Sequence, residues 1–468
     1  MTKHFVLGRF VFALTGAVLA HGAAWGAVPL INESVYPASV PPGSPAFTLK
    51  VSGNGFTSKS TVDWNGSALP THYTSEHLLT ASVSASDVAK PRSVAITVST
   101  PGAALSNPIY FQVVSPTRTI NFTGTDYTVG NSPEAVVTAD FNHDGNLDAA
   151  VMNYADGTIS VMLGNGEGTF RVLPPYMPVA QSRLNSMALG DFDNDGNDDL
   201  VVLVSELNGN QEAVVLLGNG NGTFSAQKGA DVRVDPHINA AQLVTGDFNG
   251  DGALDIAVSD QQGSHLLVLL GNRTGELSLP ILTSLPSNQF NPVWMAVGDF
   301  NGDGKLDLAV EEPDAALLAI WLGDGSGHFT SLATMHLNGS GPGVVVAADF
   351  NGDQRPDLVI ANGNQYQVFL GKGNGTFLEL PATAIGGTSS VVVADFNGDG
   401  KLDLAMQNYE QTMVLLGEGN GKFQAPLTWP APAGSGWVIA GDFDNDGQPD
   451  LLGLLVGGSS AAVYLQTP

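Results

Sequence analysis

The stretch Asp299-Phe300-Asn301-Gly302-Asp303-Gly304-Lys305-Leu306-Asp307 occurs in seven versions along the 468-residue chain. The copies lie 46 to 56 residues apart and begin at Asp140, Asp191, Asp247, Asp299, Asp349, Asp395 and Asp442. A recurring period of this length is typical of a repeat architecture, in which each copy belongs to one structural unit. The chain from residue 117 onward is therefore predicted to be an array of similar units.

Each copy has the composition of a calcium-binding loop. Asp or Asn occupies the first, third and fifth positions, Asp always occupies the ninth, and six of the seven copies have Gly at the sixth. Ca²⁺ prefers hard oxygen ligands, and glycine permits the tight turn that brings them together. We predict metal ligation by the first, third, fifth, seventh and ninth residues of every loop. These residues are Asp140, Asn142, Asp144, Asn146, Asp148; Asp191, Asp193, Asp195, Asn197, Asp199; Asp247, Asn249, Asp251, Ala253, Asp255; Asp299, Asn301, Asp303, Lys305, Asp307; Asp349, Asn351, Asp353, Arg355, Asp357; Asp395, Asn397, Asp399, Lys401, Asp403; and Asp442, Asp444, Asp446, Gln448, Asp450.

The alternative is an EF-hand, whose loop begins in the same way. An EF-hand needs a bidentate Glu at position twelve and a helix on each side. Position twelve here is never a ligand, since it holds residues such as Val151, Val310 and Gly453. The flanking segments, such as 344–346 and 358–360, are short and rich in Val, which indicates strands. The loop is therefore predicted to join two strands of a β-hairpin.

Each unit is predicted to contain four antiparallel strands. A second recurring segment, Leu163-Gly164-Asn165-Gly166-Glu167-Gly168-Thr169-Phe170, marks the joint between the third and fourth strands. Asn-Gly between apolar runs is a strong hairpin signal. Four-stranded antiparallel repeats are typical of propeller blades. The sequence therefore predicts an all-β protein with a seven-bladed β-propeller over residues 117–468.

The two ends of the array are predicted to close the ring. The last unit ends at Val463-Tyr464-Leu465 without a fourth strand, whereas Ile120-Asn121-Phe122 is an extra strand before the first unit. Pairing the two would complete the last blade and hide a sheet edge that invites aggregation.

The seven loops, with the Gly-x-Gly-x-Phe segments, resemble the FG-GAP (also VCBS) repeats, whose best-known member is the integrin α-subunit propeller. The resemblance covers about three quarters of the chain and implies calcium-binding loops on a propeller. The loop at Asp349 departs from the pattern, because Gln354 replaces Gly and Pro356 precedes Asp357. We predict that this loop is the weakest calcium site.

The N-terminal quarter differs from the repeats. Residues 1–26 have a basic start, an apolar run and small residues at the end, which predicts a secretory signal peptide and export. Residues 27–115 contain short alternating strands and resemble the IPT/TIG group of immunoglobulin-like β-sandwiches. Trp64 is interpreted as a core residue, with stacking on a ligand as the alternative. No later stretch is long and apolar enough to predict a transmembrane segment.

The charge of the chain limits its partners. The formal net charge is −28, from 45 acidic and 17 basic side chains, and about half of the acidic side chains lie in the loops. Such a protein is not expected to bind nucleic acid by neutralising phosphates. Cysteine is absent, which excludes disulfides and thiol chemistry.

A ligand-binding surface is predicted on the face opposite the calcium loops. Two tryptophans stand five residues before the first residue of their loops, and several amides and carboxylates stand thirteen residues after the first residue of theirs. The candidate residues are Trp294, Trp437, Asn153, Asp260, Glu312, Asn362 and Asn408. They suit recognition of a sugar or a peptide, although both Trp residues would equally suit a plug in the central channel.

These observations favour a calcium-binding module that binds or adheres to a carbohydrate or an extracellular protein. The protein is expected to be exported and monomeric. Catalytic motifs are not visible in the sequence, so the chain is not expected to be an enzyme. A polysaccharide lyase or hydrolase on a propeller scaffold, and a purely structural component of the cell envelope, remain the alternatives.

Overall fold

The computed structural model describes residues 29–467 except 33–34, 104, 207–208, 228, 232–239, 261–264, 285–293, 313–315, 339–342, 387, 389, 409–410 and 431–434. The predicted signal peptide, residues 1–26, lies outside the described residues. Every named element in the described part is a β-strand, as the sequence predicted. The same residues contain no helix with the length and apolar character needed to cross a membrane.

The N-terminal part consists of two sheets around one core. The first sheet contains, in spatial order, β1 (Leu30–Ile31), β3 (Phe47–Asn54), β7 (Leu78–Val83) and β6 (Thr71–Ser75). The second contains β2 (Ser39–Val40), β9 (Ile109–Val113), β8 (Arg92–Ser99), β4 (Thr61–Trp64) and β5 (Ser67–Ala68). We refer to β1–β9 as the N-terminal sheet pair. Trp64 is 4% exposed and its ring lies 5.3 Å from that of Phe111, which confirms its interpretation as a core residue.

Each repeat forms one antiparallel sheet with its strands in sequence order. The first two sheets contain β11 (Pro133–Ala139), β12 (Asp148–Asn153), β13 (Thr158–Gly164) and β14 (Phe170–Val172); and β15 (Ser182–Gly190), β16 (Asp199–Glu206), β17 (Gln211–Gly218) and β18 (Phe224–Ala226), with β19 (Ala230–Asp231) beside β17. The next two contain β20 (Ala240–Gly246), β21 (Asp255–Asp260), β22 (His265–Leu269) and β23 (Ile281–Ser284); and β24 (Trp294–Gly298), β25 (Asp307–Glu312), β26 (Leu317–Gly323) and β27 (Phe329–His336).

The remaining sheets follow the same order. They contain β28 (Gly343–Ala348), β29 (Asp357–Asn362), β30 (Gln365–Gly371) and β31 (Phe377–Glu379), with β32 (Thr383–Ala384) beside β30; and β33 (Ser390–Ala394), β34 (Asp403–Gln407), β35 (Gln411–Leu415) and β36 (Leu427–Pro430). The last sheet contains β37 (Ser435–Gly441), β38 (Asp450–Leu455), β39 (Ser460–Thr467) and β10 (Asn121–Thr128).

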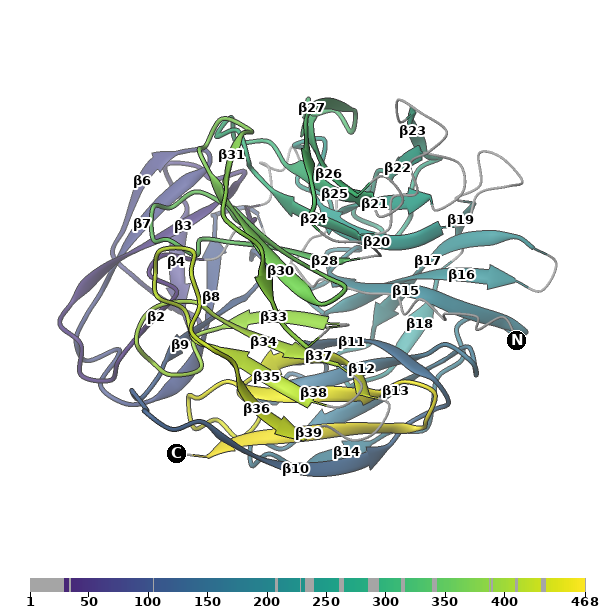
Figure 1. The fold of residues 1–468 in the computed structure, drawn as a ribbon. Coiled ribbons are helices and arrows are strands. Elements are labelled where there is room, and N and C mark those ends of the chain that lie inside the picture. Colours follow the sequence, from purple (N-terminus) through teal and green to yellow (C-terminus); the bar gives the residue numbers. More distant parts are fainter. Residues whose placement is uncertain are drawn as a thin grey trace.

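The sheets surround a common centre and form a β-propeller (Figure 1). The first strand of each sheet contacts the first strand of the next, from β11 through β15, β20, β24, β28 and β33 to β37, and β37 contacts β11. The second strands are buried along almost their whole length, because each sheet is covered by a neighbour on both faces. Strands covered in this way have continuous apolar runs, as the Val-rich segments of this sequence do.

The predicted closure of the ring is confirmed. Strand β10 pairs antiparallel with β39 over eight residues, with Phe122 opposite Gln466 and Thr123 opposite Leu465. The Phe122 ring packs against Trp429 at 5.2 Å, and the Tyr127 ring packs against Phe170 at 5.7 Å. The N-terminal strand of the array therefore contacts the sheets on both sides of the closure.

Candidate metal centre

The seven Asp-rich loops lie at one end of the ring. Each loop joins the first strand of a sheet to its antiparallel second strand, as residues 299–307 join β24 to β25. The first strands of the sheets all point toward the same end of the ring. The loops that follow them therefore all lie at this rim.

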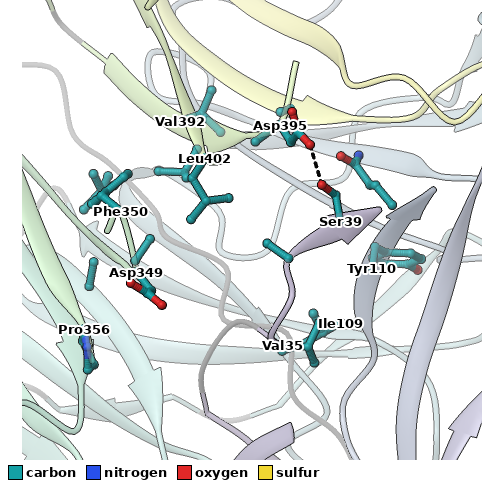
Figure 2. A pocket seen from close by; sticks show the side chains of 18 of the residues that line it. Val35, Ser39, Ile109, Tyr110, Asp349, Phe350, Pro356, Val392, Asp395 and Leu402 are labelled. Atoms are coloured by element: carbon teal, nitrogen blue, oxygen red, sulfur yellow. Dashed lines mark hydrogen bonds between the residues drawn. The ribbon is translucent and has the colours of Figure 1, made fainter. Parts of the chain in front are cut away.

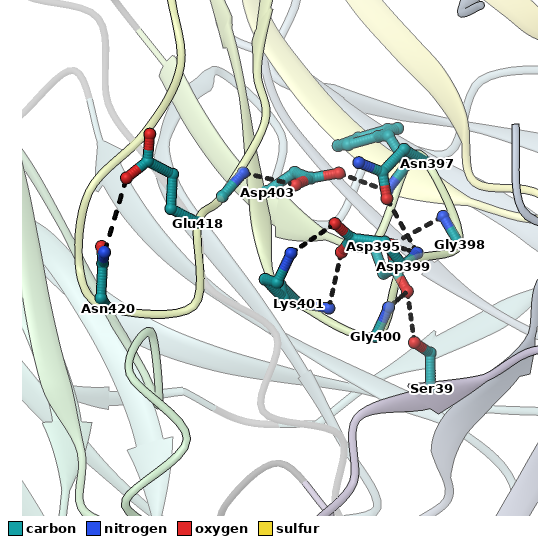
Figure 3. A network of polar contacts seen from close by, with 12 residues as sticks. Ser39, Asp395, Asn397, Gly398, Asp399, Gly400, Lys401, Asp403, Glu418 and Asn420 are labelled. Carbon is teal, nitrogen blue, oxygen red and sulfur yellow. Dashed lines mark hydrogen bonds and ion pairs between the residues drawn. The ribbon is translucent and has the colours of Figure 1, made fainter. Parts of the chain in front are cut away.

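The first Asp of a loop organises the turn through its carboxylate. In the loop that begins at Asp395, Oδ1 accepts hydrogen bonds from Gly398 N at 2.8 Å and Asp399 N at 3.2 Å, and Oδ2 accepts one from Gly400 N at 2.9 Å (Figure 3). The Asp299 loop repeats this set with Gly302, Asp303 and Gly304. One carboxylate therefore holds three consecutive N–H groups of the turn.

The third and fifth side chains continue the same pattern. Asn397 Oδ1 accepts a hydrogen bond from Asp399 N at 2.8 Å, and Asp399 Oδ1 accepts one from Lys401 N at 3.1 Å. The oxygen-bearing side chains are thus directed back toward the backbone of their own loop. At the seventh position the Lys401 ammonium pairs with the Asp399 carboxylate at 2.7 Å. Only the backbone carbonyl of this residue is therefore a donor suited to Ca²⁺.

The fourth and sixth residues have left-handed backbone conformations in every loop. The φ angles at the sixth position run from 66° at Gln354 to 92° at Gly196. Three loops have a residue other than glycine at the fourth position: His143, Asn194 and Asn445, with φ of 59°, 70° and 58°. The sequence predicted the glycine requirement only at the sixth position.

The ninth Asp has a structural role that the sequence did not reveal. Asp403 Oδ2 accepts a hydrogen bond from Phe396 N at 2.9 Å, and its Oδ1 accepts one from Gly417 N at 2.7 Å. The same two contacts occur at Asp199, Asp255, Asp307 and Asp357. Asp450 makes equivalent contacts with Phe443 N and Gln466 N, whereas Asp148 has, among the described residues, only the contact with Gly164 N. Six of the ninth Asp residues therefore join the start of the loop to the end of the third strand, and their remaining lone pairs could ligate a cation.

Burial raises the pKa of the ninth Asp carboxylates. The ninth Asp residues are completely buried, and this desolvation raises the pKa of Asp199, Asp255 and Asp450 to about 8. It raises the pKa of Asp148, Asp307, Asp357 and Asp403 to about 7, although the backbone N–H groups act in the opposite direction. A nearby cation would favour the ionised form of all seven.

The residues present fit a divalent cation. Oxygen atoms of Asp191, Asp193 and Asp195 lie within 4.8 Å of one another, and those of Asp442, Asp444 and Asp450 form a second such group. Asp442 is 2% exposed, and its Oδ1 has no hydrogen-bond partner among the described residues. A buried, ionised carboxylate oxygen without a hydrogen-bond partner destabilises the fold unless a nearby cation compensates its charge.

The pH dependence of stability follows from these pKa values. The folded-state pKa values of about 7 to 8 lie above the ordinary Asp value of 3.8. The protonated ninth Asp residues therefore make their full contribution to the free energy of unfolding below the ordinary Asp pKa of 3.8. This contribution is lost as the pH rises through the folded-state values of about 7 to 8. We expect the stabilisation of the protein by Ca²⁺, measured as the difference in unfolding temperature between Ca²⁺ and chelator, to be larger at about pH 8.5 than at about pH 6. An equal difference at both values would contradict this prediction.

Gln354 adopts the conformation that glycine has in the other loops. Its φ is 66°, and its N–H donates to Asp349 Oδ2 at 2.8 Å. Its side-chain Oε1 accepts a hydrogen bond from Lys50 Nζ in the N-terminal sheet pair. A side chain at positive φ costs about 1–2 kcal/mol.

Replacing Gln354 by Gly or by Ala gives a matched pair, because both variants lose the contact with Lys50. Only Ala keeps the strained side-chain carbon, so Gln354→Gly is expected to exceed Gln354→Ala in free energy of unfolding by about 1 kcal/mol. Denaturant unfolding of both variants in excess Ca²⁺ measures this difference. Equal stability would mean that the loop relaxes its backbone when the residue changes.

Most of the predicted ligand-binding residues are buried rather than exposed. Trp294 and Trp437 are 4% and 5% exposed, and their rings lie 6.2 Å apart in the core of the ring. Asn153, Asp260, Glu312 and Asn362 are also buried, and only Asn408 is partly exposed. Desolvation raises the pKa of Glu312 to about 8. The tryptophan pair therefore has the placement expected of a channel plug and does not form an exposed aromatic surface.

Two residues that contact the loops could not be identified from the sequence. The hydroxyl of Ser39 donates to Asp395 Oδ2 (Figures 2 and 3). The hydroxyl of Ser93 donates to Asp442 Oδ2 at 2.8 Å. Both serines belong to the N-terminal sheet pair and are separated from their partners by about 350 residues. No local motif marks them.

Comparisons with known proteins agree with this geometry. A sequence profile described as an FG-GAP-like repeat matches residues 140–202, 191–258, 247–310, 313–360, 349–406 and 395–453. Cartilage acidic protein 1 of Mus musculus is 30% identical over 158 residues, which cover 31% of this chain and 24% of that protein. Integrin alpha-PS2 of Drosophila melanogaster is 30% identical over 94 residues, which cover 20% of this chain and 7% of that protein. The chain thus spans about a quarter or less of the length of these relatives.

A solved structure has a similar fold at low sequence identity. The crystal structure of BBS1N in complex with ARL6DN superposes with a TM-score of 0.52 at 10% identity, covering 74% of this chain and 96% of that chain. At this identity the likeness concerns the fold alone.

Proposed function

Since the chain belongs to the FG-GAP-like repeat family, we propose that it is an exported calcium-binding propeller of seven blades that acts as a binding or adhesion module. The observation that carries the proposal is the set of seven loops at one rim, each with oxygen-bearing residues at the same positions. Ca²⁺ would be held by the first, third and fifth side chains, the seventh carbonyl and the ninth carboxylate. When bound, the ion would supply the positive charge that compensates the loop carboxylates. The chain itself forms the turn through hydrogen bonds between these carboxylates and N–H groups of the loop.

The ligand is proposed to be a carbohydrate or an extracellular protein. The similarity to integrin alpha-PS2 and to cartilage acidic protein 1 supports a module of this kind. The proposed export rests on the signal-peptide pattern of residues 1–26. The N-terminal sheet pair is proposed to be the IPT/TIG-like immunoglobulin-type domain, and the mature protein is proposed to be a monomer.

Three measurements test the proposed function. Calorimetric titration with Ca²⁺ should show binding at several sites, because seven loops have the ligand set. A glycan array probed with the full-length protein in Ca²⁺ tests carbohydrate binding, and a solid-phase assay with extracellular-matrix proteins tests protein binding. A lyase and hydrolase assay on acidic polysaccharides tests the enzymatic alternative. Turnover in the last assay, without binding in the others, would overturn the proposal.

A further inference from the structure

The N-terminal sheet pair is seated directly on the loop rim of the propeller. Ser39 and Ser93 donate their hydroxyls to the first Asp of two adjacent loops, at Asp395 and Asp442. The segment that follows β9 adds a backbone contact, since Thr117 N donates to Asn397 O at 2.9 Å. The contacts therefore fall on the residues that form the proposed calcium sites.

Glycines in the loops permit this close approach. A side-chain carbon added at Gly304 would lie 2.4 Å from the His77 ring, and one added at Gly447 would lie 2.4 Å from Arg92 N. A carbon added at Gly398 would lie 2.9 Å from Ser115 O. At Gly145 and Gly196, by contrast, an added carbon would meet no described atom within 4 Å. Glycine thus serves the contact with the N-terminal sheet pair in some loops, in addition to the turn.

The carboxylates that the two serines contact are buried. Asp395 and Asp442 are 3% and 2% exposed, and Asp247 and Asp191 have the same two values, whereas the first Asp residues at 140, 299 and 349 are partly exposed. The Ser93 hydroxyl satisfies Asp442 Oδ2, but Oδ1 has no described hydrogen-bond partner. Burying an ionised carboxylate is costly without a compensating charge. A cation at these loops would therefore favour the contact, and the contact would favour the cation.

The contact also forms one side of a partly open chamber of about 770 Å³ between the two parts of the chain (Figure 2). Its walls are mainly apolar, with Val35 and Ile109 on the N-terminal side and Val346, Val392 and Ile439 on the propeller side. Lys50 and Gln354 meet at its edge. Movement of the N-terminal sheet pair away from the loops would expose the apolar walls of this chamber further to solvent.

We propose that Ca²⁺ bound in the loops at Asp395 and Asp442 holds the N-terminal sheet pair against the propeller, with Ser39 and Ser93 fixing the first carboxylate of each site. Loss of the ion releases the sheet pair and exposes the walls of the chamber. The inference rests on the proposed calcium binding. The coupling is reciprocal, because docking must raise calcium affinity by the same factor by which calcium favours docking.

The experiment compares the double variant Ser39→Ala/Ser93→Ala with Ser52→Ala in the full-length protein. Ser52 lines the same chamber, but its side chain makes no hydrogen bond to a loop among the described contacts. Calorimetric titration with Ca²⁺ measures affinity, and small-angle X-ray scattering in Ca²⁺ and in chelator measures compactness. Loss of partners that orient metal ligands lowers affinity by 10–100-fold. We expect two sites of the double variant to weaken by about 10-fold, with no change in Ser52→Ala.

The scattering should show a larger radius of gyration for the wild type in chelator than in Ca²⁺. At the lowest Ca²⁺ concentration that saturates the wild type, the double variant should have a radius of gyration between those of the calcium-bound and the chelated wild type. The inference is overturned if the wild type binds Ca²⁺ but is equally compact in chelator, or if the double variant behaves like Ser52→Ala. If the wild type binds no Ca²⁺, the proposed function fails as well, so the two failures are distinguishable.

Discussion

In millimolar Ca²⁺ the protein is expected to unfold at a temperature roughly 10 °C or more above its unfolding temperature in chelator. An ion that binds only the folded state contributes about 2.7 kcal/mol per site at a hundred times its dissociation constant. Several loops are expected to contribute in this chain. Without a cation the loop at Asp191 places the carboxylates of Asp191, Asp193 and Asp195 within 4.8 Å of one another, and the loop at Asp442 does the same with Asp442, Asp444 and Asp450. Removal of the ion therefore combines the loss of ligation with repulsion between like charges.

Differential scanning calorimetry in Ca²⁺, Mg²⁺ and chelator measures the effect. Mg²⁺ is the control for ionic strength and charge, because it demands a smaller and nearly octahedral shell. It should stabilise the protein much less than Ca²⁺. An unfolding curve that is the same in Ca²⁺ and in chelator would contradict calcium binding by the loops.

The second large effect is expected on removal of β10. A variant that lacks residues 29–116 keeps β10, whereas one that lacks 29–130 loses it, so the pair differs only in the closing segment. Without β10, strand β39 loses its partner along eight residues and becomes an open sheet edge. The aromatic contacts of Phe122 with Trp429 and of Tyr127 with Phe170 are lost as well. Open edges of this kind promote association between chains.

We expect the variant that lacks residues 29–130 to aggregate and the variant that lacks residues 29–116 to remain folded. Size-exclusion chromatography with light scattering in Ca²⁺ measures the oligomeric state, and calorimetry measures the unfolding temperature. A loss of several kcal/mol is expected from the unpaired backbone groups and the lost aromatic packing. If the two variants have the same unfolding temperature and are both monomeric, the closing strand does not stabilise the ring.

The ninth Asp makes structural hydrogen bonds and is also a predicted metal ligand, so a substitution there changes both. Asp307 joins Phe300 N to Gly323 N and is completely buried, whereas Asp303 in the same loop is exposed. A change at Asp307 therefore removes structural hydrogen bonds as well as a metal ligand. A change at Asp303 tests the metal ligand more directly.

The sequence alone determined the repeats, the turns and the closure of the ring. The recurring Asp and Gly positions are local, and each loop forms from side chains that bond to N–H groups within five residues, as at Asp299. A count of strands was enough to predict the pairing of β10 with β39, because an incomplete sheet at one end matched an extra strand at the other.

Only the tertiary structure placed the N-terminal sheet pair on the loops and the two tryptophans in the core. Ser39 and Asp395 are 356 residues apart, and nothing in the residues around Ser39 records its partner. From the sequence, Trp294 and Trp437 suited an exposed surface and a central plug equally well. The structure buries both side chains and places their rings 6.2 Å apart. Such contacts depend on the relative positions of whole sheets, which local residue patterns do not encode.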